Sequence, residues 1–165
     1  MMAVRLAKVV MTAALAAFAL IVTYDNIVDY GSNYAFVQHV LSMDTTFPGN
    51  RLMDRAITNP TLWHAAYVAI IIAEGLTFLL LAIGALVMLT AMGGPAERFN
   101  RTKVWLVAGA TLGFCVWFFG FMVVGGEYFA MWQSKDWNGQ EAAFRFYMAL
   151  LGVLIFVSQP DSELA

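Results

Sequence analysis

The stretch from Asn59 to Met92 constrains the fold of this chain more than any other. Between Tyr67 and Ala91 its only charged residue is Glu74. Because about 20 apolar residues, rising 1.5 Å each, cover a hydrocarbon core of ~30 Å, the stretch predicts a membrane-spanning helix. An acid inside such a helix is costly, so Glu74 is also the first candidate for a functional site.

The composition requires a bilayer as the solvent for much of the chain. Of the 165 residues, 61% are hydrophobic and 12% are charged, whereas a soluble domain carries about 25% charged residues. The net charge of −2 provides no basic surface, so we expect no nucleic-acid partner. The single cysteine, Cys115, excludes an intrachain disulfide, and its apolar surroundings predict an unreactive thiol packed in the bundle.

Three further apolar segments complete a predicted bundle. The spanning helices are expected at about 8–30, 60–92, 102–131 and 140–158. The first segment has the basic start of a signal peptide, but its apolar run continues past a cleavage-like site at 17–19, so we expect it to be retained as a helix. In the third segment, Gly109 and Gly113, with Gly120 near the same stripe, predict close approach of a neighbouring helix.

The connection between the first two helices is long and patterned. Residues 33–43 and 50–58 have helical apolar spacing, and a turn at 45–49 separates them. We expect two short amphipathic helices that lie at the membrane surface with their apolar sides down. The predicted fold is therefore all-α, a single integral membrane four-helix bundle over 1–165 with an amphipathic extracytoplasmic cap between helices 1 and 2.

The placement of lysine and arginine sets the expected orientation. Five lie in two short segments on one side, namely Arg5, Lys8, Arg98, Arg101 and Lys103. Four lie on the other side in longer, acid-rich stretches, namely Arg51, Arg55, Lys135 and Arg145. Because short cytoplasmic segments are enriched in basic residues, we expect both termini in the cytoplasm.

Glu74 has two interpretations. It lies seven residues inside Tyr67, a depth of ~10 Å, where a carboxylate costs several kcal/mol unless it is paired, hydrated or protonated. The functional interpretation is a proton relay or a ligand for a cation or cofactor. The structural interpretation is a buried partner for Arg145, or for a hydroxyl or backbone group on a neighbouring helix. The sequence leaves both open.

A second candidate group gathers at the predicted outer ends of the helices. In an up-and-down bundle, the ends of helices 1 and 3 meet the starts of helices 2 and 4. The group comprises Asp25, Asn26, Asp29, His39, His64, Tyr67, Glu127 and Arg145. Asp25 and Asp29 share a helical face and need compensation, and Glu127 and Arg145 are candidate salt-bridge partners. These residues form either a ligand- or metal-binding pocket under the surface loop, or interfacial groups that bond to each other and to water.

The two histidines raise the question of a metal or haem. His39 and His64 are candidate haem ligands, or join Met43 and Met53 in a copper site. Neither histidine has a partner at ligand spacing on a spanning helix, so His39, His64 and Glu127 are weak metal candidates and the cofactor stays unassigned. The chain has no nucleophile elbow, P-loop, dinucleotide fingerprint or HExxH motif, so nothing predicts an enzyme.

Several blocks resemble the DUF2165 family of predicted small integral membrane proteins. They are 24–33 (YDNIVDYGSN), 36–45 (FVQHVLSMDT), 55–58 (RAIT), 64–67 (HAAY), 120–134 (GFMVVGGEYFAMWQS) and 137–145 (WNGQEAAFR). The resemblance covers nearly the whole chain. It implies a bacterial four-helix protein of the inner membrane, and it supplies no catalytic residue to carry over. All these blocks fall at the predicted outer ends and loops.

Three functions are compatible with this sequence. The first is a non-catalytic accessory or interaction subunit that engages a membrane protein partner or a second copy of the chain. The second is a membrane binding or redox protein that holds a lipid, quinone, haem or metal near Glu74, His64 and Glu127. The third, a proton-coupled transporter, has little support because one buried acid and no inverted repeat are present.

Overall fold

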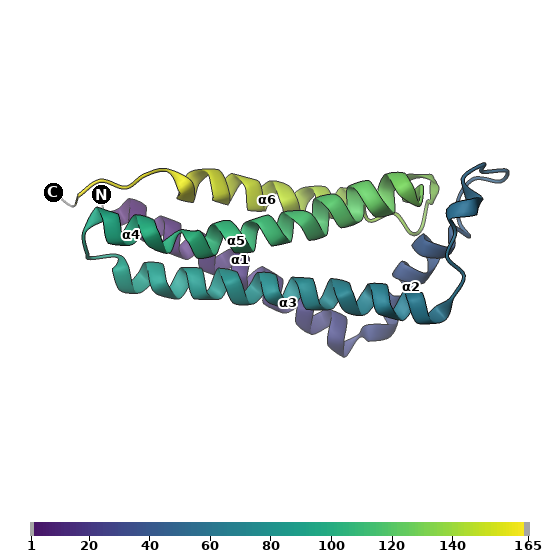
Figure 1. Ribbon diagram of the computed structural model, residues 1–165, viewed down its shortest axis with the longest axis horizontal. Helices are drawn as coiled ribbons and strands as arrows, with labels where there is room; N and C mark the ends of the chain where they lie inside the picture. Colours follow the sequence, from purple (N-terminus) through teal and green to yellow (C-terminus); the bar gives the residue numbers. More distant parts are fainter. Residues whose placement is uncertain (1, 164–165) are drawn as a thin grey trace.

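The computed structural model describes residues 2–163, and within this range it contains helices and no strand. Four helical segments are long and apolar enough to cross a membrane. They are α1 (Met2–Val28), α3 (Pro60–Ala91), the segment Ala96–Tyr128 and α6 (Gln140–Ser158). Figure 1 shows them running side by side along the long axis of the molecule. The predicted all-α membrane bundle of four spanning helices is confirmed.

The third spanning segment has three parts. It comprises α4 (Ala96–Thr102), α5 (Val104–Phe114) and η2 (Cys115–Tyr128), which is a π-helix. The third spanning helix, expected from about residue 102, therefore continues a helical segment that begins at Ala96. Glu97 in the first turn of α4 favours this because it complements the helix dipole and pairs with Arg101 one turn later.

The short elements gather at the opposite end of the bundle from α4 (Figure 1). They are α2 (Tyr30–Ser42), η1 (Met53–Arg55) and η3 (Met131–Gln133). The helix expected over 50–58 is wrong, because only one 3₁₀ turn forms there. Val40 of α2 and its C-cap residue Met43 are buried against residues 129–131, so this helix packs into the end of the bundle.

The glycine stripe of the third spanning segment is used inside the chain. A Cβ added at Gly109 would lie 2.9 Å from Leu81 Cγ of α3, and one added at Gly113 would lie 2.9 Å from Leu150 Cδ1 of α6. The close helix approach predicted from these glycines is therefore with neighbouring helices of the same bundle. Gly120 does not share this close approach, because a Cβ added there would meet only Cys115 O, at 3.8 Å.

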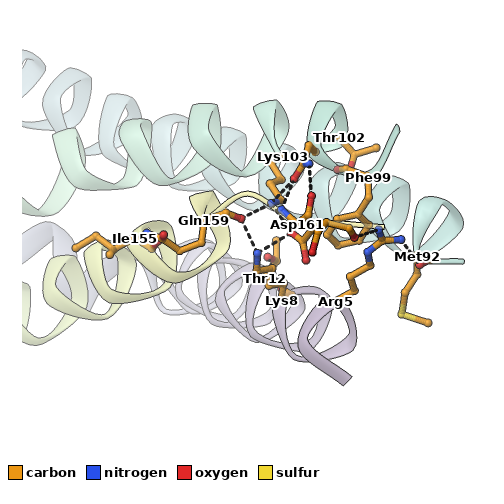
Figure 2. A network of polar contacts seen from close by, with 12 residues as sticks. Arg5, Lys8, Thr12, Met92, Phe99, Thr102, Lys103, Ile155, Gln159 and Asp161 are labelled. Atoms are coloured by element: carbon orange, nitrogen blue, oxygen red, sulfur yellow. Dashed lines mark hydrogen bonds and ion pairs between the residues drawn. The ribbon is translucent and has the colours of Figure 1, made fainter. Parts of the chain in front are cut away.

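A polar network closes the end where the first and last segments meet (Figure 2). Lys8 Nζ and Lys103 Nζ lie 2.7 and 2.5 Å from the same oxygen, Asp161 Oδ2. Both lysines also donate to the backbone oxygen of Gln159, at 2.7 and 2.6 Å. Asn100 Nδ2 donates to Asp161 O over 2.9 Å, and Asp161 N donates to Asn100 Oδ1 over 3.0 Å. The residues after α6 are thus fixed between α1 and the third spanning segment.

Arg5 extends this network without pairing with a carboxylate among residues 2–163. Its side chain is fully buried and donates to the carbonyl oxygens of Met92, Gly94 and Ser162 at 2.9, 2.7 and 3.0 Å. From the sequence, Arg5 served only to predict the orientation of the chain in the membrane. In the structure it also anchors the turn between α3 and α4.

Candidate functional site

Glu74 lies in the interior of the bundle and not against lipid. Its exposed fraction is 2%, and Asn26 Nδ2 of α1 donates to its Oε2 over 2.7 Å. Asn26 is the one donor to this carboxylate within residues 2–163, and no basic side chain of that range pairs with it. Arg145, one of the partners considered from the sequence, instead pairs with Glu141 one turn earlier on the surface of α6.

The position of Asn26 is fixed from two other helices. Tyr67 OH of α3 donates to Asn26 O over 3.0 Å and lies 3.2 Å from Asn26 Oδ1. Asn33 Nδ2 of α2 donates to the same Oδ1 over 2.6 Å. Because donors face the amide oxygen from both sides, the amide nitrogen must point toward Glu74. The network joins α1, α2 and α3 at this level.

A cavity of about 260 Å³ lies against Glu74. Four polar residues line it, and they are Asn26, Asn33, Tyr67 and Glu74. Aromatic rings form much of the remaining wall, from Phe36, Trp117, Phe121 and Phe146. A single acid in a mainly aromatic cavity can accept a hydrogen bond from a ligand or face an organic cation.

A second hollow adjoins this cavity on the apolar side. It has a volume of about 390 Å³ and lies between α2, α3 and the third spanning segment. Its wall is almost entirely apolar and includes Cys115, which is exposed there. The prediction that Cys115 packs inside the bundle is therefore wrong. Phe36, Val37, Ile70 and Phe121 line both hollows, so one layer of side chains separates them.

The histidines lie in separate local contacts. His39 Nδ1 is 2.9 Å from Asp44 Oδ2, and its ring stacks on Trp137 with the centroids 4.4 Å apart. His64 Nδ1 is 2.9 Å from Tyr30 OH, and its ring stacks on Tyr34 with the centroids 4.2 Å apart. No group of three or more His, Cys, Asp and Glu side chains suited to a metal ion occurs in the part of the chain that the structure describes.

The acidic candidates at the outer ends are exposed. Asp25, Asp29 and Glu127 face the surroundings of the bundle, and Ser32 Oγ donates to Asp29 Oδ2 over 2.8 Å. The salt bridge considered between Glu127 and Arg145 does not form, because Arg145 pairs within its own helix. Of the nine candidates from the sequence, the structure joins Asn26, Tyr67 and Glu74 in one hydrogen-bonded group.

Asn33 and the aromatic wall were not among the candidates predicted from the sequence. Asn33 lies seven residues after Asn26, a spacing that shares a face on one continuous helix, but the first spanning helix was expected to end at residue 30, so Asn33 was assigned to the surface connection. Trp117 and Phe121 lie in the π-helix, where residues that share a face are spaced differently from those of an α-helix. Both Asn26 and Asn33 lie in the segment 24–33, one of the blocks that resemble the family, and this shared block could have linked them.

Comparison with known proteins identifies the family. The model of the family described as predicted small integral membrane protein (DUF2165) matches residues 4–160. The match covers most of the chain, so the chain belongs to this family. No curated protein and no solved structure matches it.

Proposed function

We propose that this DUF2165 protein is a membrane-embedded binding protein that holds a small lipid-soluble molecule against Glu74. The observation that carries the proposal is a buried carboxylate that faces a cavity and receives one hydrogen bond, from Asn26, among residues 2–163. A carboxylate accepts several hydrogen bonds when fully satisfied, so a ligand group can supply the remainder. The cavity is close in size to the smaller ligand pockets of proteins, about 300 Å³.

A purely structural role for Glu74 accounts for less of this geometry. An acid kept for packing is expected to be enclosed by donors or by a basic partner, because an unpaired buried charge destabilises the fold. Tyr67 and Asn33 instead donate to Asn26, and neither forms a hydrogen bond with the carboxylate among residues 2–163. This arrangement orients one donor toward Glu74, which lines the cavity.

The expected orientation places the cavity toward the exterior. We infer from the basic residues near α4 that both termini are cytoplasmic in a bacterial inner membrane. The Glu74 cavity then lies nearer the extracytoplasmic side, beneath a cap formed by α2 and the following loop. A ligand reaches it from the outer leaflet or from the extracytoplasmic solution.

The test is to identify what co-purifies with the protein from its own membrane. We expect mass spectrometry of the wild-type protein in mild detergent to detect a lipid-soluble compound that the Glu74→Gln variant lacks. Glu97→Gln, which alters an exposed acid in α4, is the matched control and should retain the compound. An absorption spectrum and metal analysis of the same sample distinguish a haem or metal from an organic ligand. Equal retention by both variants, or no compound in any sample, would refute the proposal.

A second candidate, an accessory subunit that engages a partner, is favoured by a different observation. The outer loops carry exposed apolar side chains, and Phe47 and Trp132 contact each other edge to face with centroids 5.8 Å apart. Such a pair suits either a partner protein or the headgroup region. Cross-linking in native membranes tests this: a specific adduct lost in Phe47→Ser supports a partner, and none supports lipid contact.

A further inference from the structure

We infer that the ligand is an amphiphile with two parts, an organic ammonium head in the Glu74 cavity and one apolar chain in the adjoining groove. This rests on the proposed function and specifies the chemical class of its ligand. The groove is defined here as the 390 Å³ hollow lined by α2, α3 and η2. The charge of the cavity, its aromatic wall and the groove on the other side of that wall support this assignment.

The head is inferred from the absence of a counter-charge. No lysine, arginine or histidine side chain of residues 2–163 forms an ion pair with Glu74. An ammonium group would supply that charge and relieve the cost of a carboxylate at this depth. The rings of Trp117, Phe121 and Phe146 line the same cavity. Aromatic faces attract organic cations, so carboxylate and rings together favour an ammonium over a neutral or anionic head.

The chain is inferred from the shape and position of the groove. Its walls are apolar, and Cys115 and Phe119 at its lining are exposed outside the bundle, where the acyl chains lie. The π-helix contributes to its wall from Cys115 to Gly125, and such helices frequently occur at functional sites. A single layer of side chains, including Phe36 and Phe121, separates the groove from the head cavity. A chain that extends from a head group at Glu74 into the groove must therefore pass between these apolar side chains.

The groove should set specificity more than affinity for long chains. A chain that moves from lipid into an apolar groove gains little hydrophobic free energy, because both surroundings are apolar. If the groove is blocked, the apolar chain of a ligand no longer fits while the ammonium head occupies the Glu74 cavity. A bulky residue in the groove should therefore weaken chain-bearing ligands and spare a short head group.

The experiment compares defined probes in phosphatidylcholine nanodiscs, with partitioning corrected by empty discs. The probes are decyltrimethylammonium, decanol and decanoate, which share one chain, and tetramethylammonium, which has none. Binding is followed by quenching of tryptophan fluorescence, since Trp117 lines the cavity. The proteins are wild type, Glu74→Gln, Cys115→Phe and Ala149→Phe, and Ala149 is a small exposed residue of α6 that is absent from the groove lining.

We expect decyltrimethylammonium to bind wild type at least about tenfold more tightly than decanol or decanoate, and Glu74→Gln to abolish this preference. Because Cys115→Phe overfills the groove, it should weaken binding of decyltrimethylammonium about tenfold and leave binding of tetramethylammonium unchanged. Ala149→Phe should change the binding of neither probe. If Cys115→Phe does not fold, N-ethylmaleimide on wild type provides the block, because Cys115 is the single cysteine.

Two results would overturn the inference while the proposed function stands. Decanol or decanoate binding as tightly as the ammonium probe would refute the cationic head. Equal behaviour of Cys115→Phe and Ala149→Phe toward the decyl probe would refute the chain site. If no probe binds and no compound co-purifies, the proposed function itself is refuted.

Discussion

Replacing Asp161 by asparagine tests whether buried ion pairs hold the residues after α6 against the bundle. In the wild-type protein Lys8 and Lys103 share Asp161 Oδ2, with exposed fractions of 2% and 7% for the two lysine side chains and 7% for the acid. The asparagine keeps the size of the side chain and one acceptor oxygen but removes the charge. Two buried ammonium groups are then left with neutral acceptors, including the Gln159 carbonyl.

The magnitude follows from what remains around the lysines. Removing one partner of a buried ion pair costs about 3–5 kcal/mol. The carbonyl of Gln159 and the new amide oxygen offset part of this loss, so we expect about 3 kcal/mol. For a chain of this length, 1 kcal/mol corresponds to a shift of about 2–4 °C in Tm, which gives an expected decrease of about 6–12 °C.

The assay is thermal unfolding in mild detergent, followed by tryptophan fluorescence. Glu97→Gln is the matched control. Both side chains of the Glu97–Arg101 ion pair are exposed, so the pair contributes less than about 1 kcal/mol to stability. A double-mutant cycle with Lys8→Met should give a coupling free energy of at least about 1 kcal/mol with Asp161→Asn. Similar Tm values for Asp161→Asn and Glu97→Gln, or additive effects in the cycle, would show that the network does not stabilise the fold.

Three further outcomes are expected. Burial opposes ionisation of Asp161, but the hydrogen bonds from Lys103 and Lys8 outweigh this effect and lower its pKa. The stability difference between wild type and Asp161→Asn should therefore be largest above pH 3.8, the ordinary pKa of the group, and decline as the pH falls further. The measurement is the difference in Tm between the two proteins across pH. Gly113→Ala should destabilise by about 1–3 kcal/mol because its Cβ would lie 2.9 Å from Leu150, whereas Gly152→Ala, with open space, should stabilise by about 0.5–1 kcal/mol; equal Tm values for the two would contradict this. Tyr67→Phe should cost about 1–2 kcal/mol and weaken ligand retention at Glu74, because Asn26 loses one of the donors that fix its amide; unchanged retention would show that Tyr67 does not position the site.

The spanning segments were predictable because hydropathy alone decides whether a helix crosses a bilayer. Asn59 and Pro60 also located the start of α3, where the Asn59 side chain accepts a hydrogen bond from Thr61 N over 2.9 Å. The π-helix was not predictable from hydropathy. Every residue of 115–126 is apolar or glycine, so the segment has the same hydropathy whether it forms an α-helix or a π-helix.

The interior position of Glu74 was predictable, but the helix faces that surround it were not. Counting residues from Tyr67 placed Glu74 within the hydrocarbon region, and the structure shows it buried beneath Tyr67 and Asn26. Which helix faces supply its partners depends on how each helix is rotated about its axis, and an apolar segment leaves that rotation undetermined. The considered pairings of Arg145 with Glu74 or Glu127 do not form. Arg145 instead pairs with Glu141, which lies one turn away on the same helix.

The two ends of the bundle treat buried charge in opposite ways, and the contrast supports the proposed function. At the end near α4, Lys8, Lys103 and Arg5 are buried. Both lysines contact the Asp161 carboxylate, and Arg5 donates to three carbonyl oxygens through its two terminal nitrogens, while its Nε has no hydrogen-bond partner among the described residues. The two buried lysine charges are therefore paired with an acid of the same chain. Glu74 has one amide donor, no basic partner among residues 2–163, and a cavity beside it. A chain that can assemble three cations around one tail segment has the means to neutralise one acid. That it does not do so at Glu74 is what a site kept open for a charged ligand requires.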